Sequence, residues 1–385
     1  MPLPTDPSRS APSLSTTPLR AVDRARVAFR CGEVVAISSD DGTIALVLSV
    51  ETLTTQALAT LERLAGTVPV MALTRWRAAA LGLISPGGTG VVTLTPPEAL
   101  SAAAIHALVD PAAFPGSEPG KTATVNTVPV TEAGAHAVAA VRLSKLAALL
   151  PTAVVAQLRA DRTSNADWLL QHDLRLVRAG DIADYRRIEA RALRRVADAR
   201  VPLADAPNAQ VIAFRPSNGG HEHLAVIIGA PDPAEAVLVR MHSECFTGDL
   251  LGSLRCDCGE QLRHAIATIA KQGHGIVLYL AQEGRGIGLV NKLRAYQLQD
   301  EGYDTLDANE ALGFDADERL YLPAAEILRQ LGFERVRLMT NNPDKMAQLA
   351  RCGIDVTERV PHIIPSNDYN AAYLRTKVLR GGHLF

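Results

Sequence analysis

Short apolar runs alternate with helix-like patterns through the second half of the chain. Each run is a few residues long and is bounded by glycine or polar residues, as buried strands are. The runs predict strands over residues 237–241, 275–281, 335–339 and 354–360. Apolar positions at helical spacing predict helices over residues 258–271 and 289–299, and from 343 to just before 353. This alternation indicates an α/β (α+β) fold in which a mixed sheet is flanked by helices.

The first half is richer in alanine, and its patterns are less regular. A turn signal at Asp41 and Gly42 separates strands predicted over residues 34–37 and 44–48. The remaining elements are helices predicted over residues 22–30, 54–64 and 138–150, and a loop predicted over residues 113–121. Between residues 190 and 207 the sequence becomes charged and then rich in proline. We therefore predict a disordered tail over residues 1–18, a first domain over 19–190 and a second over 191–385, each domain with its own mixed sheet.

Composition narrows the class of protein. The 385 residues are 47% hydrophobic and 21% charged, which excludes a mostly disordered chain, a collagen-like chain and a small disulfide scaffold. A net charge of −2 gives no basic field for nucleic acid. No apolar stretch approaches the ~20 residues that a membrane span needs. The Pro- and Ser-rich amino terminus has no secretory signal, so we expect a cytoplasmic protein.

Three of the five cysteines, Cys245, Cys256 and Cys258, lie close together in the sequence. Zinc prefers thiolate ligands, and three protein ligands plus a water form the open arrangement of a catalytic zinc site. His242 is a candidate fourth ligand that would close the site into a structural one, and three buried cysteines without metal are a further alternative. The polar residues around the trio favour the metal site. Cys258 also begins a predicted helix, whose amino end favours a thiolate.

Two strand-to-helix turns have the character of anion-binding loops. In residues 282–288, QEGRGIG, the glycines let the backbone approach an anion, Glu283 offers a carboxylate for a guanine edge, and Arg285 offers a guanidinium for phosphate. An ordinary tight turn is the alternative, because the motif matches neither the dinucleotide fingerprint nor the Walker pattern. In residues 340–345, TNNPDK, Thr340 and Lys345 form a second anion cradle, and helix capping by Asn342 is expected beside it.

Two further features indicate no chemistry by themselves. Residues 315–319, DADER, are typical of a solvated charged loop. Tyr296 shares a helical stripe with Leu289 and Lys292, which is typical of the edge of a hydrophobic core.

Together these segments resemble the GTP cyclohydrolase II family of riboflavin biosynthesis, from about residue 192 to the end. The segments that carry the resemblance are RMHSECFTGDLLGSLRCDCGEQL, QEGRGIGLVNKLRAYQLQDEGYDTLDAN, LGFDADERLY and LMTNNPDKM. The resemblance implies hydrolysis of GTP to 2,5-diamino-6-ribosylamino-4(3H)-pyrimidinone 5′-phosphate, formate and pyrophosphate, the first step of riboflavin biosynthesis. It also implies a homodimer, Mg²⁺ with the triphosphate, and one Zn²⁺ per subunit on Cys245, Cys256 and Cys258.

The same resemblance implies roles for single residues. Asp317 occupies the position of the general base, and Arg319 the position assigned as nucleophile on the α-phosphorus. Relatives that stop at the formamide lack the tyrosine at position 296, so Tyr296 favours the full reaction. The positions at which the family binds GTP are Arg240, Met241, His242, Ser243, Glu244, Gln261, Glu283, Gly284, Arg285, Thr305, Thr340 and Lys345.

The first half resembles, more faintly, the family of 3,4-dihydroxy-2-butanone 4-phosphate synthase, over residues 19–190. The segments RVAFRCGEVVAIS, VLSVETLTTQALATL and LLQHDLRLVRAGDIADYRR carry this resemblance. That family follows its first strand with an acidic loop that binds Mg²⁺ and substrate, whereas here Ser38 to Thr43 lead directly into the next strand. His136 is present, but Val138 stands where a catalytic glutamate is expected. Without those carboxylates we predict a first domain with no synthase activity.

Two other functions stay open on the sequence. A non-catalytic GTP-sensing or interaction protein would bind GTP without turning it over. A cyclohydrolase variant that halts at the formamide would differ only in the mass of its product.

Overall fold

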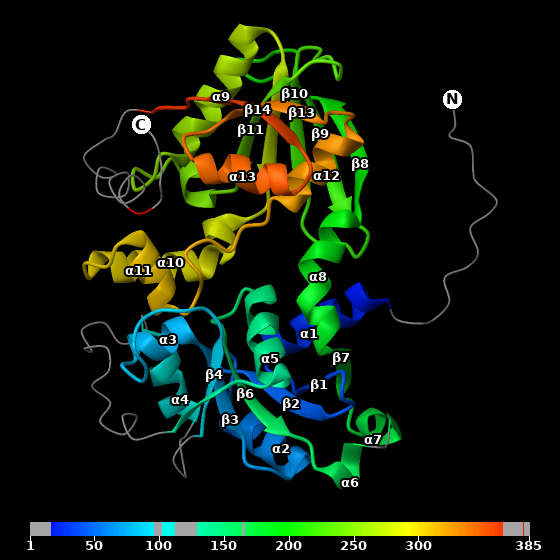
Figure 1. The fold of residues 1–385 in the computed structure, drawn as a ribbon, viewed down its shortest axis with the longest axis vertical. Coiled ribbons are helices and arrows are strands. Elements are labelled where there is room, and N and C mark those ends of the chain that lie inside the picture. The colour runs from blue at the N-terminus through cyan, green and yellow to red at the C-terminus, as the bar shows by residue number, and fades with distance from the viewer. Residues whose placement is uncertain (1–16, 96–101, 112–128, 164–165, 365–379, 381–385) are drawn as a thin grey trace, which may run out of the picture.

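The computed structural model describes residues 17–95, 102–111, 129–163, 166–364 and 380, and contains two mixed sheets flanked by helices (Figure 1). The predicted two-domain α/β organisation is confirmed. We call the part built on each sheet the first and the second domain. The predicted tail falls outside the described residues as far as residue 16, and Pro18 already begins a helix. The loop predicted over residues 113–121 also falls outside them.

The first sheet has the strand order β5-β4-β3-β6-β2-β1-β7, and only β1 and β7 pair in parallel. Its strands are β1 (Val35–Ser38), β2 (Ile44–Ser49), β3 (Val70–Thr74), β4 (Val91–Leu94), β5 (Val130–Glu132), β6 (Thr152–Gln157) and β7 (Arg175–Arg178). The helices around it are α1 (Pro18–Arg30), α2 (Thr55–Ala65), α3 (Arg75–Ala80), α4 (Ala102–Val109), α5 (Ala135–Leu146), α6 (Ala160–Thr163), α7 (Ala166–Gln171) and α8 (Ala179–Arg191).

Helix α5 differs most from its prediction over residues 138–150. It begins at Ala135 and ends at Leu146, and Ala148 beyond it has a φ of 56°, which is incompatible with a continuing right-handed helix. The apolar residues Leu149 and Leu150, which extended the helical pattern in the sequence, are buried next to strand β6 instead.

The second sheet has the order β14-β13-β11-β12-β10-β9-β8. Its strands are β8 (Leu193–Arg200), β9 (Gln210–Pro216), β10 (His223–Ile228), β11 (Val237–Ser243), β12 (Gly275–Leu280), β13 (Arg335–Met339) and β14 (Asp355–Val360). Its helical segments are η1 (Phe246–Leu250), α9 (Cys258–Gln272), η2 (Glu283–Gly286), α10 (Leu289–Asp300), α11 (Thr305–Ala311), α12 (Leu322–Gln330) and α13 (Pro343–Arg351). Strands β14, β13, β11 and β12 are mutually parallel, and β12, β10, β9 and β8 are antiparallel.

The sequence predicted no strand at β8, β9 or β10. Strand β8 is exposed at every position after Leu193, so it carries none of the apolar alternation on which a strand prediction depends. Its partner β9 and the next strand β10 bury only some of their residues, including Phe214 and Ala225. The central strands β11 and β12, in contrast, are buried at nearly every position, which makes them apolar runs in the sequence.

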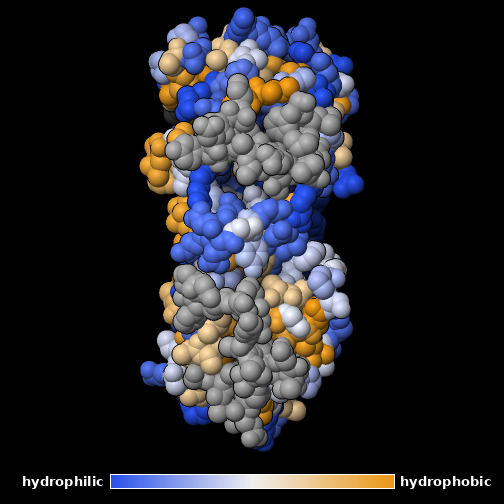
Figure 2. All heavy atoms as spheres, turned by 90° about the vertical axis from the view of Figure 1, so that its left-hand side faces the viewer, coloured by the Kyte–Doolittle hydropathy of each residue, from blue (hydrophilic) through white to orange (hydrophobic). Residues whose placement is uncertain are grey.

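One apolar core continues from the first domain into the second. Leu48 and Met71 of the first sheet share this cluster with Leu298, Leu312 and Phe314 of the second domain, all of them at most 2% exposed. Helices α10 and α11 lie between the two sheets in Figure 1, and Figure 2 shows hydrophilic side chains gathered on the surface of this middle region. No helix within the described ranges has the length and apolar character to cross a membrane.

Candidate active site and metal centre

The loops that follow β11, β12 and β13 meet at one end of the second sheet. Strand β11 lies between β12 and β13, so the chain continues to β12 on one side of β11 and later returns to β13 on the other side. Ligands of open α/β sheets bind at the carboxyl ends of the strands, where the strand order reverses. A cavity of about 360 Å³ opens here.

Every predicted site residue except Met241 lines this cavity. Met241 is 3% exposed and packs in the apolar core of the second sheet. The reason is the two-residue period of a strand, which sends Arg240 and His242 to one face and Met241 to the other. The Met241 side chain therefore faces away from the cavity, and a contact of its backbone with GTP stays a prediction.

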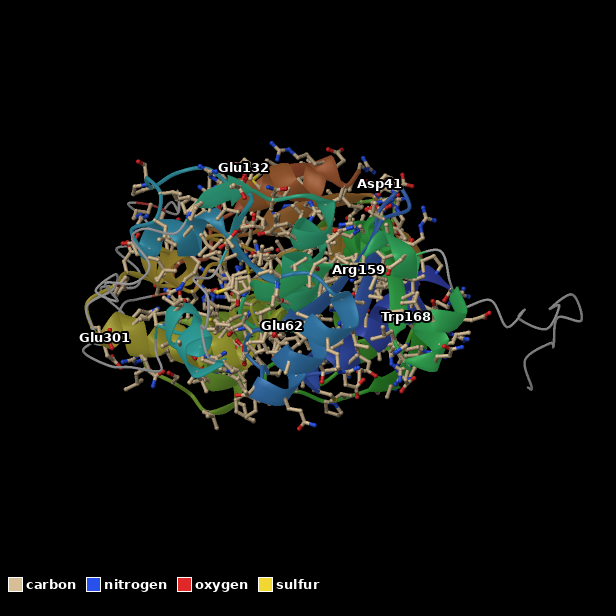
Figure 3. The ribbon with its side chains drawn as sticks, turned by 90° about the horizontal axis from the view of Figure 1, so that it is seen from below. Asp41, Glu62, Glu132, Arg159, Trp168 and Glu301 are labelled. Atoms are coloured by element: carbon tan, nitrogen blue, oxygen red, sulfur yellow. The ribbon has the colours of Figure 1, made fainter. Side chains whose placement is uncertain are left out.

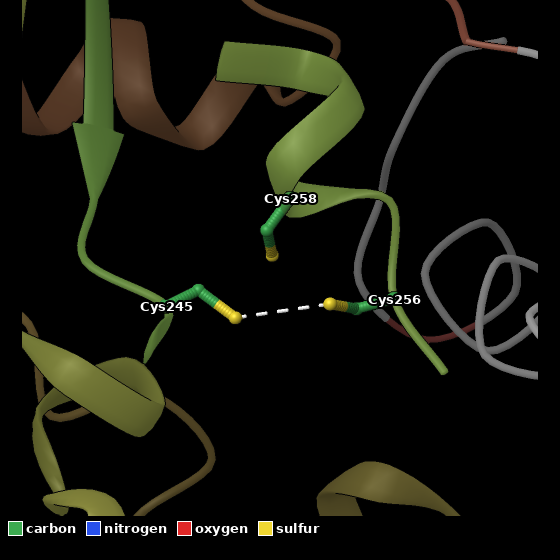
Figure 4. Close-up of side chains that lie close together, drawn as sticks. All are labelled: Cys245, Cys256 and Cys258. Carbon is green, nitrogen blue, oxygen red and sulfur yellow. Dashed lines mark hydrogen bonds between the residues drawn. The ribbon is translucent and has the colours of Figure 1, made fainter. Parts of the chain in front are cut away.

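The three cysteine sulfurs converge at one edge of the cavity (Figure 4). The Sγ atoms of Cys245 and Cys256 are 3.7 Å apart, and those of all three cysteines lie within 4.8 Å of one another. Tetrahedral zinc with Zn–S bonds of about 2.3 Å places its sulfurs about 3.8 Å apart. The geometry therefore fits a zinc ion. Among the described residues, no other group of three potential ligands is gathered in this way.

A glycine makes room for the three thiols. A Cβ atom on Gly248 would lie 2.8 Å from the Cys256 sulfur and 3.1 Å from the Cys245 sulfur. Those distances are shorter than van der Waals contact, so any larger residue would displace the thiols. The short segment η1, which contains Gly248, thus packs directly behind the sulfur cluster.

His242 does not point to the cysteine trio. Its Nε2 atom lies 3.0 Å from both carboxylate oxygens of Asp249, which also accepts from the backbone N–H of Cys245 and from the hydroxyl of Tyr279. Burial lowers the pKa of His242, although Asp249 opposes the shift. His242 therefore does not serve as a fourth ligand in this structure. The open three-thiol site is the arrangement that the geometry favours.

Lys292 is the main site residue that the sequence did not identify. Its ammonium group donates to Cys245 Sγ at 3.1 Å, to the Thr247 hydroxyl at 2.9 Å and to Glu283 Oε1 at 2.9 Å. The hydrogen bond to Glu283 raises the pKa of Lys292 in spite of burial, so this side chain stays charged. A cation beside three thiols lowers the cost of holding them as thiolates. The only hint of Lys292 in the sequence was that it lies on the same face of the predicted helix as Tyr296.

Glu283 is already engaged by the protein. Besides Lys292, it accepts from the backbone N–H groups of Phe246 and Gly284 at 2.6 and 2.7 Å. In this structure its carboxylate therefore orders the wall of the cavity, in addition to any contact with a guanine edge. The following residues Gly284 and Arg285 both have positive φ, at 61° and 59°, so the turn is strained at Arg285.

Asp317 and Arg319 line the same cavity and form a two-point ion pair. Arg319 Nε lies 2.8 and 3.1 Å from the two carboxylate oxygens, and the Nη2 group contacts Oδ2. Burial raises the pKa of Asp317, but the hydrogen bonds from Arg319 outweigh this, and the pKa lies below its usual value. Asp317 is therefore ionised at neutral pH.

The remaining polar walls are also held by internal hydrogen bonds. Arg240, 5% exposed, donates to the Met339 carbonyl at 3.2 Å and to the Gln261 side chain. Thr340 Oγ1 accepts from the Asn342 N–H, and Asn342 caps α13 by accepting from Asp344 N at 2.9 Å. The expected capping by Asn342 is confirmed, and Lys345 lines the cavity on the same turn.

Comparisons with known proteins agree with this site. The family model for GTP cyclohydrolase II matches residues 194–361. The chain is 58% identical to a GTP cyclohydrolase-2 from Azospirillum brasilense, over 98% of this chain and 99% of that protein. It is 45% identical to a riboflavin biosynthesis protein RibBA from Synechocystis over 66% of this chain, but over only 47% of that longer protein. The chain belongs to the GTP cyclohydrolase II family.

Comparison with solved structures gives matches with low scores. A two-domain 3,4-dihydroxy-2-butanone 4-phosphate synthase from A. baumannii aligns with 89% of this chain and 99% of its own, at 16% identity and a TM-score of 0.35. A 3,4-dihydroxy-2-butanone 4-phosphate synthase of Candida albicans covers 43% of this chain at 22% identity and a TM-score of 0.34. Scores this low carry no argument about chemistry.

Proposed function

We propose that the protein is a zinc-dependent GTP cyclohydrolase II that releases formate and pyrophosphate from GTP in riboflavin biosynthesis. The observation that carries the proposal is a trio of thiols at zinc-binding spacing, opening into the same cavity as Asp317, Arg319 and two cationic loops. Membership of the GTP cyclohydrolase II family supports the same reaction.

Cys245, Cys256 and Cys258 would hold the zinc ion. When bound with an open fourth position, zinc lowers the pKa of a coordinated water and so supplies a nucleophile at neutral pH. Lys292, whose ammonium group lies 3.1 Å from the Cys245 sulfur, would neutralise part of the negative charge of the three thiolates. Tyr296, whose pKa burial raises to about 12, keeps its proton and can donate a hydrogen bond beside the same edge of the cavity.

Asp317 and Arg319 would act on the phosphate and proton-transfer side of the reaction. Arg319 is paired with a carboxylate, so its guanidinium is protonated. A protonated guanidinium can neutralise charge on the α-phosphate, but it is poorly suited to attack the phosphorus. An entering phosphate competes with Asp317 for Arg319. The Asp317 oxygens are then available to accept a proton from the reacting water.

The cationic loops would bind the triphosphate, and Mg²⁺ would accompany it and neutralise part of its charge. Arg285 and Lys345 both line the cavity and come from the turns after β12 and β13. Two cations from separate turns can contact different phosphates and thereby fix the direction in which GTP lies. The expected homodimer and cytoplasmic location stay predictions, and thiol ligands suit a reducing compartment.

The test is to incubate the purified protein with GTP and to measure formate, pyrophosphate and zinc in the same sample. The expected result is one formate and one pyrophosphate per GTP, with about one zinc per subunit. Zinc-loaded protein that binds GTP but releases neither product would identify the non-catalytic alternative. Pyrophosphate without formate, and a product heavier by a formyl group, would identify the variant that halts at the formamide.

For the first domain we propose that no synthase activity is present. The turn between β1 and β2 spans only residues 39–43, and its Asp41 carboxylate accepts from the Thr43 hydroxyl at 2.7 Å and the Thr43 N–H at 3.0 Å. His136 contacts the Thr43 carbonyl at 3.1 Å. Asp41 Oδ1 and the His136 ring are thus bonded to Thr43, and the described residues of this turn gather no set of carboxylates that could bind Mg²⁺.

A further inference from the structure

We propose that the first domain positions the catalytic loop of the second, with Lys145 and Trp76 as the positioning residues. The catalytic loop is residues 312–321, which connect α11 to α12 and carry Asp317 and Arg319. The proposal rests on the proposed function, since it assigns a role in that reaction to a domain without chemistry of its own.

The two sides of the catalytic loop face different partners. Ala316, Asp317 and Arg319 line the cavity. Asp315 and Glu318, in contrast, turn to the first domain and bind Lys145 of helix α5. The sequence indicated a solvated charged loop here, and that interpretation is wrong for Glu318, whose side chain is 9% exposed. Its charge is hidden because a cation from the other domain covers it.

Lys145 bridges both ends of the segment that carries Asp317. Its ammonium group donates to Asp315 Oδ2 at 3.1 Å and to Glu318 Oε1 at 2.5 Å. The Lys145 side chain is itself only 15% exposed. The pair with Glu318 is shielded from solvent, whereas the Asp315 side chain is 43% exposed. A shielded ion pair is screened less by salt than a surface pair, and loss of one partner leaves an uncompensated charge. One lysine thus restrains the loop on either side of the proposed base.

Other first-domain groups fix the same loop. Trp76 Nε1 donates to Asp315 Oδ1 at 2.9 Å, and Arg186 of α8 donates to the Glu318 carbonyl at 3.0 Å. The hydroxyl of Thr74 donates to the Gly313 carbonyl at 2.7 Å. Phe314, 1% exposed, is buried in the core that both domains share.

The opposite edge of the catalytic loop rests on the glycine turn after β12. Glu318 N–H donates to the Arg285 carbonyl at 3.0 Å, and a Cβ atom on Gly286 would lie 2.9 Å from the Glu318 carbonyl oxygen. The loop is therefore held between the first domain and a phosphate-binding turn of the second. A shift of the first-domain side moves Asp317 and Arg319 relative to the thiols, and misplacement of about 1 Å can cost a hundredfold in rate.

The experiment compares GTP turnover by Lys145→Ala, Lys145→Arg and Arg142→Ala. Arg142 is an exposed cation on the same helix, so it controls for loss of charge from α5. We expect Lys145→Ala to lower kcat about tenfold with KM for GTP and zinc content unchanged, because positioning affects the reacting groups and not the binding groups. Lys145→Arg, which can still pair with both carboxylates, should recover most of kcat, and Arg142→Ala should match the parent.

Two further measurements separate positioning from general damage. In an Asp317→Asn background, Lys145→Ala should lower kcat by less than about twofold, because the two substitutions act through the same loop. In a Trp168→Phe background, only Trp76 fluoresces, and Lys145→Ala should shift its emission to longer wavelength and raise its acrylamide quenching. This fluorescence change does not depend on turnover. If the parent hydrolyses no GTP, the proposed function fails, and the fluorescence alone decides whether Lys145 holds the loop.

A loss of kcat in Lys145→Ala below twofold would overturn the proposal, as would an equal loss in Arg142→Ala. The proposal would also be overturned if Lys145→Ala lowered kcat as much in the Asp317→Asn background as in the parent, or if the Trp76 emission did not change. If Lys145→Ala does not fold, Trp76→Phe removes the N–H donor to Asp315 while it keeps an aromatic ring, and its kcat is compared with those of the same control variants.

Discussion

The two domains have similar layered sheets but use their charged side chains in opposite ways. In the second domain, Lys292, Asp317 and Arg319 line a cavity that a nucleotide can enter. In the first domain, Asp41 lies at the periphery of the molecule in Figure 3, and its Oδ1 atom is bonded to Ser39 and Thr43 of its own turn. The layers depend on buried apolar residues, whereas the chemistry depends on the length and content of a few loops. A domain can therefore keep its layered sheet after it has lost the loops that carry the chemistry.

The pKa values of two aspartates express the same difference. Hydrogen bonds from Ser39 and Thr43 lower the pKa of Asp41 to about 2. The pKa of Asp317 is lowered by Arg319, a partner that an entering phosphate can draw away. A depressed carboxyl pKa stabilises the folded protein above the ordinary aspartate pKa, and this contribution is lost as the pH falls through the folded-state value. Only Asp317 has a partner that substrate binding can change.

The largest effect should come from the thiol trio. We expect Cys256→Ser to remove bound zinc and to lower formate release more than about a hundredfold, because even partners that only orient metal ligands are worth 10–100-fold. Zinc analysis and a formate assay on one sample measure both. Cys31→Ser is the matched control, since Cys31 is an exposed free thiol of the first domain. A Cys256→Ser protein with normal zinc and normal turnover would contradict the assignment.

Next in size is Asp317→Asn. The substitution keeps the shape of the side chain but removes the proton acceptor, and general-base catalysis contributes roughly 10²–10⁴-fold. We expect kcat to fall by about that factor while GTP still binds, as measured by steady-state kinetics and calorimetric titration. An unchanged kcat would show that another group accepts the proton. A large loss of GTP affinity alone would make Asp317 a binding residue.

The parts of this site that the sequence predicted are those carried by local pattern. The strands β12 and β13 and the helix after each turn follow from apolar runs, Pro343 and the glycines at 273 and 353. The roles of Asp317 and Arg319 came from resemblance, because DADER has no feature of its own that separates a catalytic loop from a solvated one.

The residues that the sequence did not predict depend on tertiary contacts. Lys145 and Glu318 are 173 positions apart, and each is an ordinary surface-type residue until the other domain buries it. Lys292 was hidden in a helical stripe because its partners Cys245 and Glu283 come from other elements. Strand β8 was not predicted because its side chains are exposed and give no apolar pattern, although its backbone pairs with β9.

A substitution at the contact between the two domains should have a smaller effect, which is on the stability of the protein. Gly313 has a φ of 90°, and a Cβ atom there would lie 2.9 Å from both Pro151 and Thr74 of the first domain. We expect Gly313→Ala to lower the free energy of unfolding by about 1–3 kcal/mol through crowding and strain. Gly302→Ala is the matched control, because Gly302 has a similar φ of 101° and nothing within 4 Å of its Cβ position. Equal losses in denaturant titrations of the two variants would show that contact between the domains contributes little.

The smallest expected effect tests the other side of the comparison. We predict that the purified protein converts no ribulose 5-phosphate above the rate of a Mg²⁺ buffer, and that Asp41→Ala leaves that background unchanged. Proton abstraction and metal binding both need carboxylates that are free to contact the sugar phosphate. Asp41 Oδ1 is instead bonded to Thr43, and Val138 offers no proton acceptor.

An active 3,4-dihydroxy-2-butanone 4-phosphate synthase in the same assay shows that the conditions permit the reaction. Conversion that exceeds the buffer and disappears in Asp41→Ala would mean that the short turn opens to expose its carboxylate. Both domains would then be catalytically active and would differ only in their rates. Conversion that persists in Asp41→Ala would point instead to groups outside this turn, and the inactivity proposed for the first domain would be wrong in either case.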